Sequence, residues 1–218
     1  MWTRSDGAGE PQRLWQSKNF LATSSFSPDG RRLAFQEGNA DTRLDIWTLP
    51  LDMTDPDHPK PGKPEVFLRT PASEQSAAFS PDGQWMAYAS NEGGTSEIYV
   101  RPLAGGGKWQ VSTGGGGNPI WSPAARQLFY AAPDGRIFVA DYTVEGNSFR
   151  RGQPHPWADK PILNRNSGGN IFDVAPDGKR LIVLPNPERT DERKENLHVT
   201  VLVNFFDELR RRMPPGGK

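Results

Sequence analysis

An unbroken apolar run recurs four times along this chain, each time at the same distance behind a proline. The fifth, sixth and seventh residues after Pro28, Pro81, Pro123 and Pro176 are all apolar or aromatic. These positions are residues 33–35, 86–88, 128–130 and 181–183. A strand with one face in water should alternate apolar and polar side chains. We therefore expect strands that are covered on both faces, as in a ring of stacked sheets.

The proline of each run belongs to a tight turn. Ser-Pro-Asp-Gly stands at residues 27–30 and 80–83, and Ala124 and Ala125 replace Asp-Gly in the third copy. Proline fixes φ, aspartate can accept a backbone N–H, and glycine tolerates the left-handed conformation. The motif predicts a hairpin turn, with a different turn in the third copy. The residues assigned to this structural turn are Ser27, Pro28, Asp29, Gly30, Ser80, Pro81, Asp82, Gly83, Pro176, Asp177 and Gly178.

The spacing of the turns sets the architecture. The four prolines are 53, 42 and 53 residues apart, about the period of a propeller blade. We predict an all-β fold, a β-propeller of four-stranded antiparallel blades spanning residues 12–204. Its repeats lie near residues 23–69, 75–112, 118–158 and 169–204, and the third ends in a long polar link. A two-sheet sandwich with internal duplication and a solenoid are the competing architectures.

The two ends of the chain bear on whether four blades close into a ring. Residues 1–11 are expected to be a disordered lead, and residues 12–16 resemble the closing strand of a blade. That strand either completes the fourth blade or begins an open arc, part of a larger propeller, whose apolar faces would self-associate. Asn204 is a plausible N-cap for a short helix in the segment 205–218, which packs on the propeller or docks a partner.

Composition excludes several classes of function. The chain has 26 basic and 26 acidic residues among 218 and no cysteine. A balanced charge favours neither nucleic acid nor an anionic membrane as partner, and thiol chemistry is excluded. No apolar run approaches the roughly 20 residues of a membrane span, and the first residues lack the apolar core of a signal peptide. The compartment stays open: periplasmic or extracytoplasmic if the chain is a piece whose targeting segment lies upstream, cytoplasmic otherwise.

Candidate chemistry is sparse, so we expect no catalytic, cofactor or metal site. His58 follows an acidic, proline-rich loop with Asp52, which is more typical of a solvated loop than of a metal site. The glycine clusters 105–107 and 114–117 do not precede a helix, so phosphate binding there is not favoured over a flexible loop. No Gly-x-Ser-x-Gly elbow occurs. The tryptophans are expected in the core.

Two motifs resemble a known repeat. Residues 26–30 and 79–83, followed by Asp-Ile-Trp at 45–47 and Glu-Ile-Tyr at 97–99, resemble the TolB-type, WD40-like (PD40) β-propeller repeat of bacteria. The similarity covers most of residues 12–204. TolB-type propellers usually have six or more blades, whereas only four motifs are visible here, so the resemblance leaves the closure of the ring in doubt.

The C-terminal part resembles one subgroup of these propellers. Residues 173–178 and 199–209 look like the end of propellers fused to bacterial serine/threonine protein kinases; similar propellers follow helix-turn-helix domains. The resemblance implies a sensory or interaction module, although no kinase motif is present. We expect a non-catalytic module that binds a protein or small ligand. The alternatives are a stand-alone periplasmic TolB-like scaffold and the accessory propeller of a serine peptidase.

Overall fold

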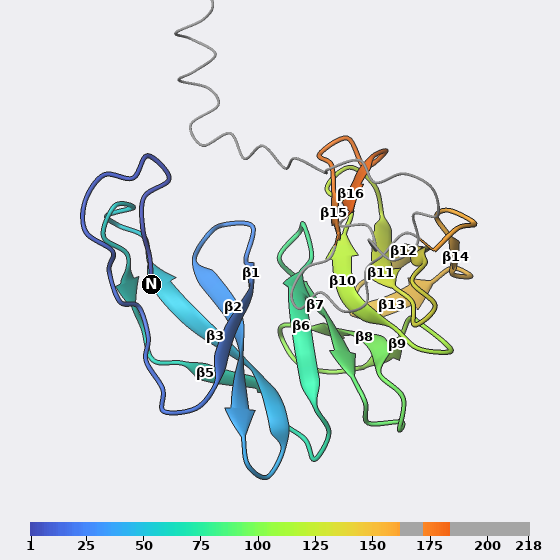
Figure 1. Ribbon diagram of the computed structural model, residues 1–218, viewed down its shortest axis with the longest axis horizontal. Coiled ribbons are helices and arrows are strands. Elements are labelled where there is room, and N and C mark those ends of the chain that lie inside the picture. The colour runs from blue at the N-terminus through green and yellow to red at the C-terminus, as the bar shows by residue number, and fades with distance from the viewer. Residues whose placement is uncertain (162–171, 184–218) are drawn as a thin grey trace, which may run out of the picture.

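The computed structural model describes residues 1–161 and 172–183. Within these ranges all helical or extended secondary structure consists of β-strands (Figure 1). The strands are β1 (Leu21–Phe26), β2 (Arg32–Asn39), β3 (Arg43–Asp52), β4 (Lys60–Pro61), β5 (Glu65–Leu68), β6 (Glu74–Phe79), β7 (Trp85–Ser90), β8 (Glu97–Pro102), β9 (Trp109–Gln110), β10 (Gly117–Trp121), β11 (Gln127–Ala131), β12 (Ile137–Glu145), β13 (Ser148–Arg151), β14 (His155–Pro156), β15 (Phe172–Val174) and β16 (Leu181–Val183). The helix expected in the segment 205–218 and the end of the fourth repeat lie outside the described residues.

These strands form antiparallel sheets that follow one another in chain order. Blade 1 is β1-β2-β3-β5, blade 2 is β6-β7-β8-β9 and blade 3 is β10-β11-β12-β14, while blade 4 contributes β15 and β16. Figure 1 shows the three four-stranded sheets in succession, with the β15–β16 hairpin beside blade 3. The predicted all-β propeller of four-stranded antiparallel blades is confirmed.

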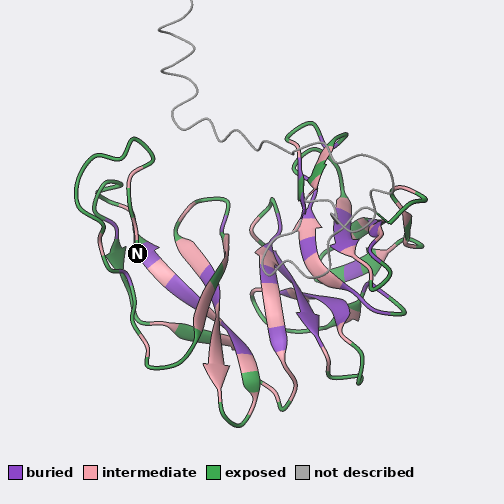
Figure 2. Ribbon diagram, viewed as in Figure 1, coloured by how far each residue is buried: buried purple, intermediate pink, exposed green. Residues whose placement is uncertain are grey.

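The apolar runs alternate between two neighbouring blades. In blade 2, Met86 and Tyr88 are buried in a cluster with Ala34 of blade 1. Ala87, which lies between them in sequence, is buried on the other face in a cluster with Leu128 of blade 3. Because successive side chains of a strand point to opposite faces, one run serves two interfaces. Figure 2 shows the result, with β7 buried along its whole length.

The same assignment holds at the next junction. Leu128 and Tyr130 of blade 3 face blade 2, whereas Phe129 is buried against Phe172 of blade 4. The fifth and seventh residues after the turn proline therefore face the preceding blade, and the sixth faces the following one. This rule explains why the runs do not alternate between apolar and polar residues.

Blades 1 and 3 each carry a hairpin that extends beyond the blade. β3 continues to pair with β4, and β12 continues to pair with β13. Both hairpins return in the same way, because Gly62 N–H donates to Pro50 O at 2.8 Å and Gly152 N–H donates to Asp141 O at 2.7 Å. A Cβ on either glycine would come within 3.3 Å of that strand. Glycine therefore permits the close return.

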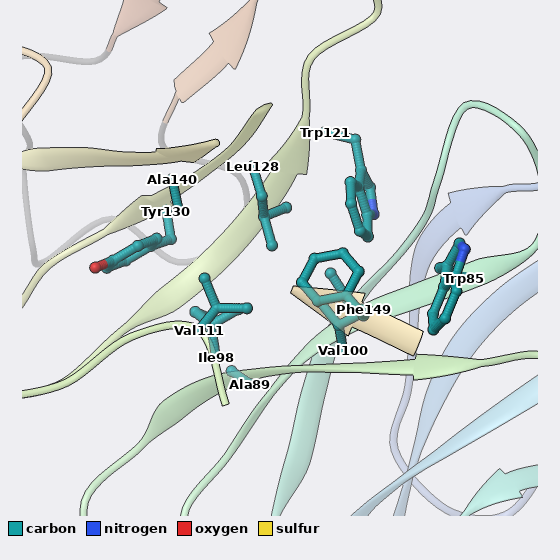
Figure 3. Close-up of a cluster of buried hydrophobic side chains, with 11 residues drawn as sticks. Trp85, Ala89, Ile98, Val100, Val111, Trp121, Leu128, Tyr130, Ala140 and Phe149 are labelled. Atoms are coloured by element: carbon teal, nitrogen blue, oxygen red, sulfur yellow. The ribbon is translucent and has the colours of Figure 1, made fainter. Parts of the chain in front are cut away.

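The hairpin of blade 3 lies on blade 2. Phe149 of β13 is 1% exposed, and its ring lies between Trp85 and Trp121 with centroid distances of 5.6 and 6.1 Å (Figure 3). Arg151 Nε donates to Gln110 O of β9 at 3.1 Å. The long polar link expected here therefore contains an anchor of the largest core cluster.

Residues 1–16 lie on the face of blade 1 that points away from blade 2. Trp2 and Gln12 exchange backbone hydrogen bonds of 2.7 and 2.8 Å, and Leu14 is buried against Phe35 and Leu49. This differs from the disordered lead expected for residues 1–11. It also differs from the strand expected at 12–16, whose backbone pairing is the bridge to Trp2. Apolar packing on blade 1 holds the segment, and the last strand of blade 4, with which it was expected to pair, lies outside the described residues.

Candidate functional site

The innermost strands of all four blades face one cavity. Its volume is about 1060 Å³, and it is partly open to solvent. Side chains with hydroxyl or amide groups line it together with apolar ones. The polar ones are Thr23, Ser24, Ser25, Gln36, Gln75, Ser76, Ser80 and Asn118; the larger apolar ones are Phe20, Phe79, Ile120, Trp121, Phe172, Ile182 and Val183. A concave surface with mixed lining and few charges is typical of a ligand pocket.

Each of the three complete blades has an irregular innermost strand beside this cavity. Register shifts occur between Thr23 and Ser25, between Gln75 and Ala78, and between Gly117 and Ile120. Ser76 and Asn118, both five residues before the turn proline, have φ values of 55° and 50°. Left-handed backbone is strained for residues other than glycine. The strain recurs at equivalent positions lining the cavity, which makes this level of the innermost strands the candidate site.

Hydrogen bonds between neighbouring blades fix the innermost strands relative to one another. Ser76 N–H donates to Gln36 Oε1 of blade 1 at 3.1 Å. Trp121 Nε1 of blade 3 donates to Ala78 O of β6 at 3.0 Å. The cavity wall is therefore joined by side chain to backbone bonds as well as by apolar packing.

The predicted turns lie at one end of this cavity. In blade 2, Ser80 N–H and Trp85 O bond at 2.9 Å, Trp85 N–H donates to Ser80 Oγ at 2.9 Å, and Gly83 has a φ of 67°. A Cβ on Gly83 would touch Pro28 at 3.6 Å, so the turns of blades 1 and 2 are neighbours. The hydroxyl of Ser80 also donates to Asp82. The turn side chains thus bond within their own turn.

The turn aspartate of blade 1 is held in the same way. Asp29 Oδ1 accepts the hydroxyl of Ser27 at 2.6 Å and the N–H of Arg31 at 3.0 Å. These hydrogen bonds, that of Ser27 first, hold the pKa of the Asp29 carboxyl below its ordinary value. The carboxylate is a structural acceptor here.

The third turn lacks the aspartate and the glycine of the motif, and the fourth lacks the serine. In blade 3, Ser122 Oγ accepts the N–H groups of Ala124 and Ala125 at 3.4 and 3.2 Å. In blade 4, Asp177 accepts the N–H of Lys179 at 3.0 Å, but Ala175 stands where blades 1 and 2 have serine.

A fifth turn of this kind joins β11 to β12 at residues 132–135. Ala132 N–H donates to Arg136 O at 2.8 Å, and Gly135 has a φ of 83°. The sequence analysis missed it, although its Ala-Pro-Asp-Gly was a signal that could have found it.

The second glycine cluster is held by a buried carboxylate. Glu97 Oε1 accepts the N–H groups of Gly114 and Gly115, both at 2.9 Å. The hydroxyl of Ser112 donates to Glu97 Oε2. The backbone N–H groups of Gly114 and Gly115 therefore donate to a side chain of the protein itself and not to a phosphate. The loop serves as a fixed link between blades 2 and 3.

A second buried acid lies where β6 begins. Thr70 Oγ1 donates to Glu74 Oε1, while Oε2 of Glu74 is buried without a partner among the described residues. Burial raises the pKa of this carboxyl. Glu74 does not line the cavity.

The other candidate residues are scattered. His58 is exposed, and its Nδ1 lies 3.1 Å from Asp55 Oδ2, not beside Asp52. His155 lies in β14, and His198 is outside the described residues. Residues 1–161 and 172–183 contain no group of three or more His, Cys, Asp or Glu side chains placed to hold a metal ion. The same ranges contain no helix of the length and hydrophobicity that a membrane span requires.

Solved structures share this architecture. TolB from Acinetobacter baumannii superposes on 87% of the chain with a TM-score of 0.60 and 19% sequence identity. The chain has a TolB-like β-propeller fold. A 6-phosphogluconolactonase-like protein from Bacteroides uniformis covers 83% of it, with a TM-score of 0.54 and 19% identity. The chain covers 43% of the first protein and 55% of the second, so it spans about half their length. Neither a family model nor a curated protein sequence matches it.

Proposed function

We propose that this TolB-like propeller is a non-catalytic binding module, and that its binding site is the cavity between the innermost strands. The observation that carries the proposal is the shared lining of one space of about 1060 Å³: blades 1 to 3 contribute hydroxyl, amide and apolar groups, and blade 4 contributes apolar groups and Asp173. Backbone strain at Ser76 and Asn118 supports it, because strained residues are concentrated at ligand sites.

The charge of the lining supports binding over catalysis. Among the described lining residues, Asp173 is the single acidic, basic or histidine side chain. General acid–base catalysis uses positioned titratable groups, whereas a neutral polar lining favours recognition of uncharged hydrogen-bonding groups. We infer a preference for neutral amide or hydroxyl ligands over carboxylates and phosphates.

The module is proposed to act as the sensory or interaction part of a bacterial signalling protein such as a serine/threonine kinase. The motif resemblance at residues 173–178 supports this role. The adjacent coding sequence tests it separately from the cavity. An in-frame kinase domain agrees with the proposal, a signal peptide directly before residue 1 favours a TolB-like scaffold, and a following hydrolase domain favours a peptidase accessory.

A filled-cavity variant tests the binding site. Thr23 is exposed and lines the cavity, so Thr23→Trp should obstruct the space at little cost in folding. Ligand-observed NMR with neutral amide and alcohol fragments, and with carboxylate fragments for comparison, measures binding. We expect neutral fragments to bind the wild type and to lose binding in Thr23→Trp.

The matched control is Thr95→Trp, on the exposed loop between β7 and β8, which does not line the cavity. It should bind like the wild type. Fragment binding that survives Thr23→Trp, or that favours carboxylates, would contradict the proposed site.

A further inference from the structure

The rule that relates the apolar runs to neighbouring blades identifies two half-interfaces at the ends of the row. In blade 1, Leu33 and Phe35 are the fifth and seventh residues after the proline, and they point away from blade 2. In blade 4, Ile182 is the sixth residue, and it points away from Leu181 and Val183, which pack toward blade 3. Ile182 is 70% exposed. At each of the three junctions inside the chain, these two kinds of position meet.

The outer face of blade 1 is covered by residues 1–16 in one part only. Leu14 covers Phe35, but Phe26 and Val66, on the same face through pairing with Leu33 and Trp47, are each 47% exposed. Large apolar side chains at this level of exposure are typical of interaction surfaces when they lie together on one face.

The covering segment resembles one strand of a blade more than a complete cap. Gln12 Nε2 donates to Pro59 O of the blade 1 hairpin at 2.9 Å, much as the hairpin of blade 3 is bonded to β9 by Arg151 and Gln110. The segment thus takes the place that the outermost strand of a neighbouring blade would have. None of the residues that the structure describes takes the places of the inner strands of such a blade.

Hydrogen bonding at this face is incomplete. Trp2 Nε1, Gln12 Oε1 and Trp47 Nε1 are buried without partners, three of the five such side-chain atoms among the described residues. By contrast, Trp121 Nε1, inside the chain, donates to a backbone carbonyl of the neighbouring blade. The two tryptophan donors of the blade 1 face thus lack, among the described residues, the backbone acceptor that Trp121 has in the neighbouring blade.

We propose that the outer face of blade 1 is an interaction surface for the outer face of blade 4 of a second copy of this chain. The contact is head-to-tail and uses the same two kinds of face as the three internal junctions, with Ile182 of one copy packed on the exposed part of the blade 1 face of the other, at Phe26 and Val66. Such a contact is heterologous, so two or more copies join in one direction. It would also add the innermost strands of the second copy to the cavity wall.

Two variants, each of which blocks one end, test the proposal. Phe26→Lys places a charge on the blade 1 face, and Ile182→Lys places one on the blade 4 face. Sedimentation velocity and light scattering over a concentration series measure the mass of the full chain. We expect the wild type to reach at least twice its monomer mass, and each single variant to remain monomeric.

The mixture of the two variants distinguishes a head-to-tail contact from other modes of association. Each variant keeps one intact end, so an equimolar mixture should form a dimer and nothing larger. Thr95→Lys is the matched control, because Thr95 is exposed on the loop between β7 and β8 and belongs to neither outer face nor to the cavity lining, and it should associate like the wild type. Thermal melting verifies that every variant is folded.

Three results would overturn the proposal. The wild type could stay monomeric at all concentrations, as it would if further residues of a longer polypeptide cover these faces. Association could persist in both variants, or the mixture of variants could fail to dimerise. Ile182 also lines the cavity, so the proposed function is tested separately, by ligand binding to Thr23→Trp, whereas these outcomes are read from mass alone.

Discussion

The turns of blades 2 and 3 join equivalent strands with different chemistry. In blade 2, the buried hydroxyl of Ser80 accepts the Trp85 N–H at 2.9 Å and donates to Asp82. In blade 3, Ser122 keeps the backbone bond to Gln127 at 2.9 Å, but its hydroxyl makes only contacts of 3.2 and 3.4 Å to the alanines. The backbone pair is common to both turns. The backbone hydrogen bond is therefore enough to form the turn, and the hydroxyl network of blade 2 adds to its stability.

Loss of the serine hydroxyl should affect the two turns unequally. Ser80→Ala leaves the buried N–H of Trp85 without an acceptor, so we expect the free energy of unfolding to fall by about 2 kcal/mol. Ser122→Ala removes only long contacts and should cost about 0.5 kcal/mol. Urea denaturation of both variants measures the difference. Equal losses would mean that the hydroxyl network of blade 2 contributes nothing specific.

The glycine of the turn gives a second contrast. Gly83 has a φ of 67°, and Gly83→Ala should lower the free energy of unfolding by about 1–2 kcal/mol because the left-handed conformation is strained for alanine. Ala125 is outside the left-handed region, so Ala125→Gly should cost at most about 1 kcal/mol, through backbone entropy alone. Thermal unfolding of both variants distinguishes the two cases. A gain in stability for Ala125→Gly would show that the third turn also favours glycine.

The fourth turn offers the reverse experiment, in which a missing group is restored. Ala175 N–H already donates to Arg180 O at 2.8 Å, and Asp177 accepts the Lys179 N–H as in the complete turns. Ala175→Ser should therefore raise the free energy of unfolding by about 1 kcal/mol. Ala175→Val, which has no hydroxyl, is the control in urea denaturation. If serine gives no more stability than valine, the hydroxyl network is not transferable between blades.

The smallest expected effect is the pH dependence of the Asp29 turn. Its folded pKa is below the ordinary value of 3.8, so the carboxylate stabilises the fold above that pH and loses its effect as the pH falls through the folded pKa. Asp29→Asn should lower the urea midpoint at about pH 5, and the difference from the wild type should shrink towards about pH 2. A difference that is independent of pH would exclude this linkage.

The repeat architecture could be predicted from the sequence because its signals are local. The runs at 86–88 and 128–130 are apolar at every position, so both faces of these strands are apolar. Such strands require a sheet that is covered on both sides. The Ser-Pro-Asp-Gly turns have a backbone mechanism that depends on four consecutive residues. Which member of each run faces which blade could not be predicted, because this depends on the direction in which the blades follow one another.

The candidate site could not be predicted for a related reason. Ser76 and Asn118 share no residue type, and their common left-handed backbone follows from a bulge that pairing with the next strand imposes. The burial of Phe149 could not be predicted from the polar link that contains it, because one buried aromatic residue in a hairpin gives no periodic signal. The placement of Leu14 depends on contacts with blade 1 rather than on the residues beside it.

The hairpin of blade 3 has a consequence for the order in which the molecule unfolds. Phe149 belongs to blade 3 by sequence, but its ring is enclosed by side chains that include Trp85 of blade 2. Opening blade 3 alone would expose the core of blade 2, so the two blades should behave as one cooperative unit in native-state hydrogen exchange. The β15–β16 hairpin packs on blade 3 through Phe172, but its two strands have three residues each and Ile182 is exposed, so it should exchange first.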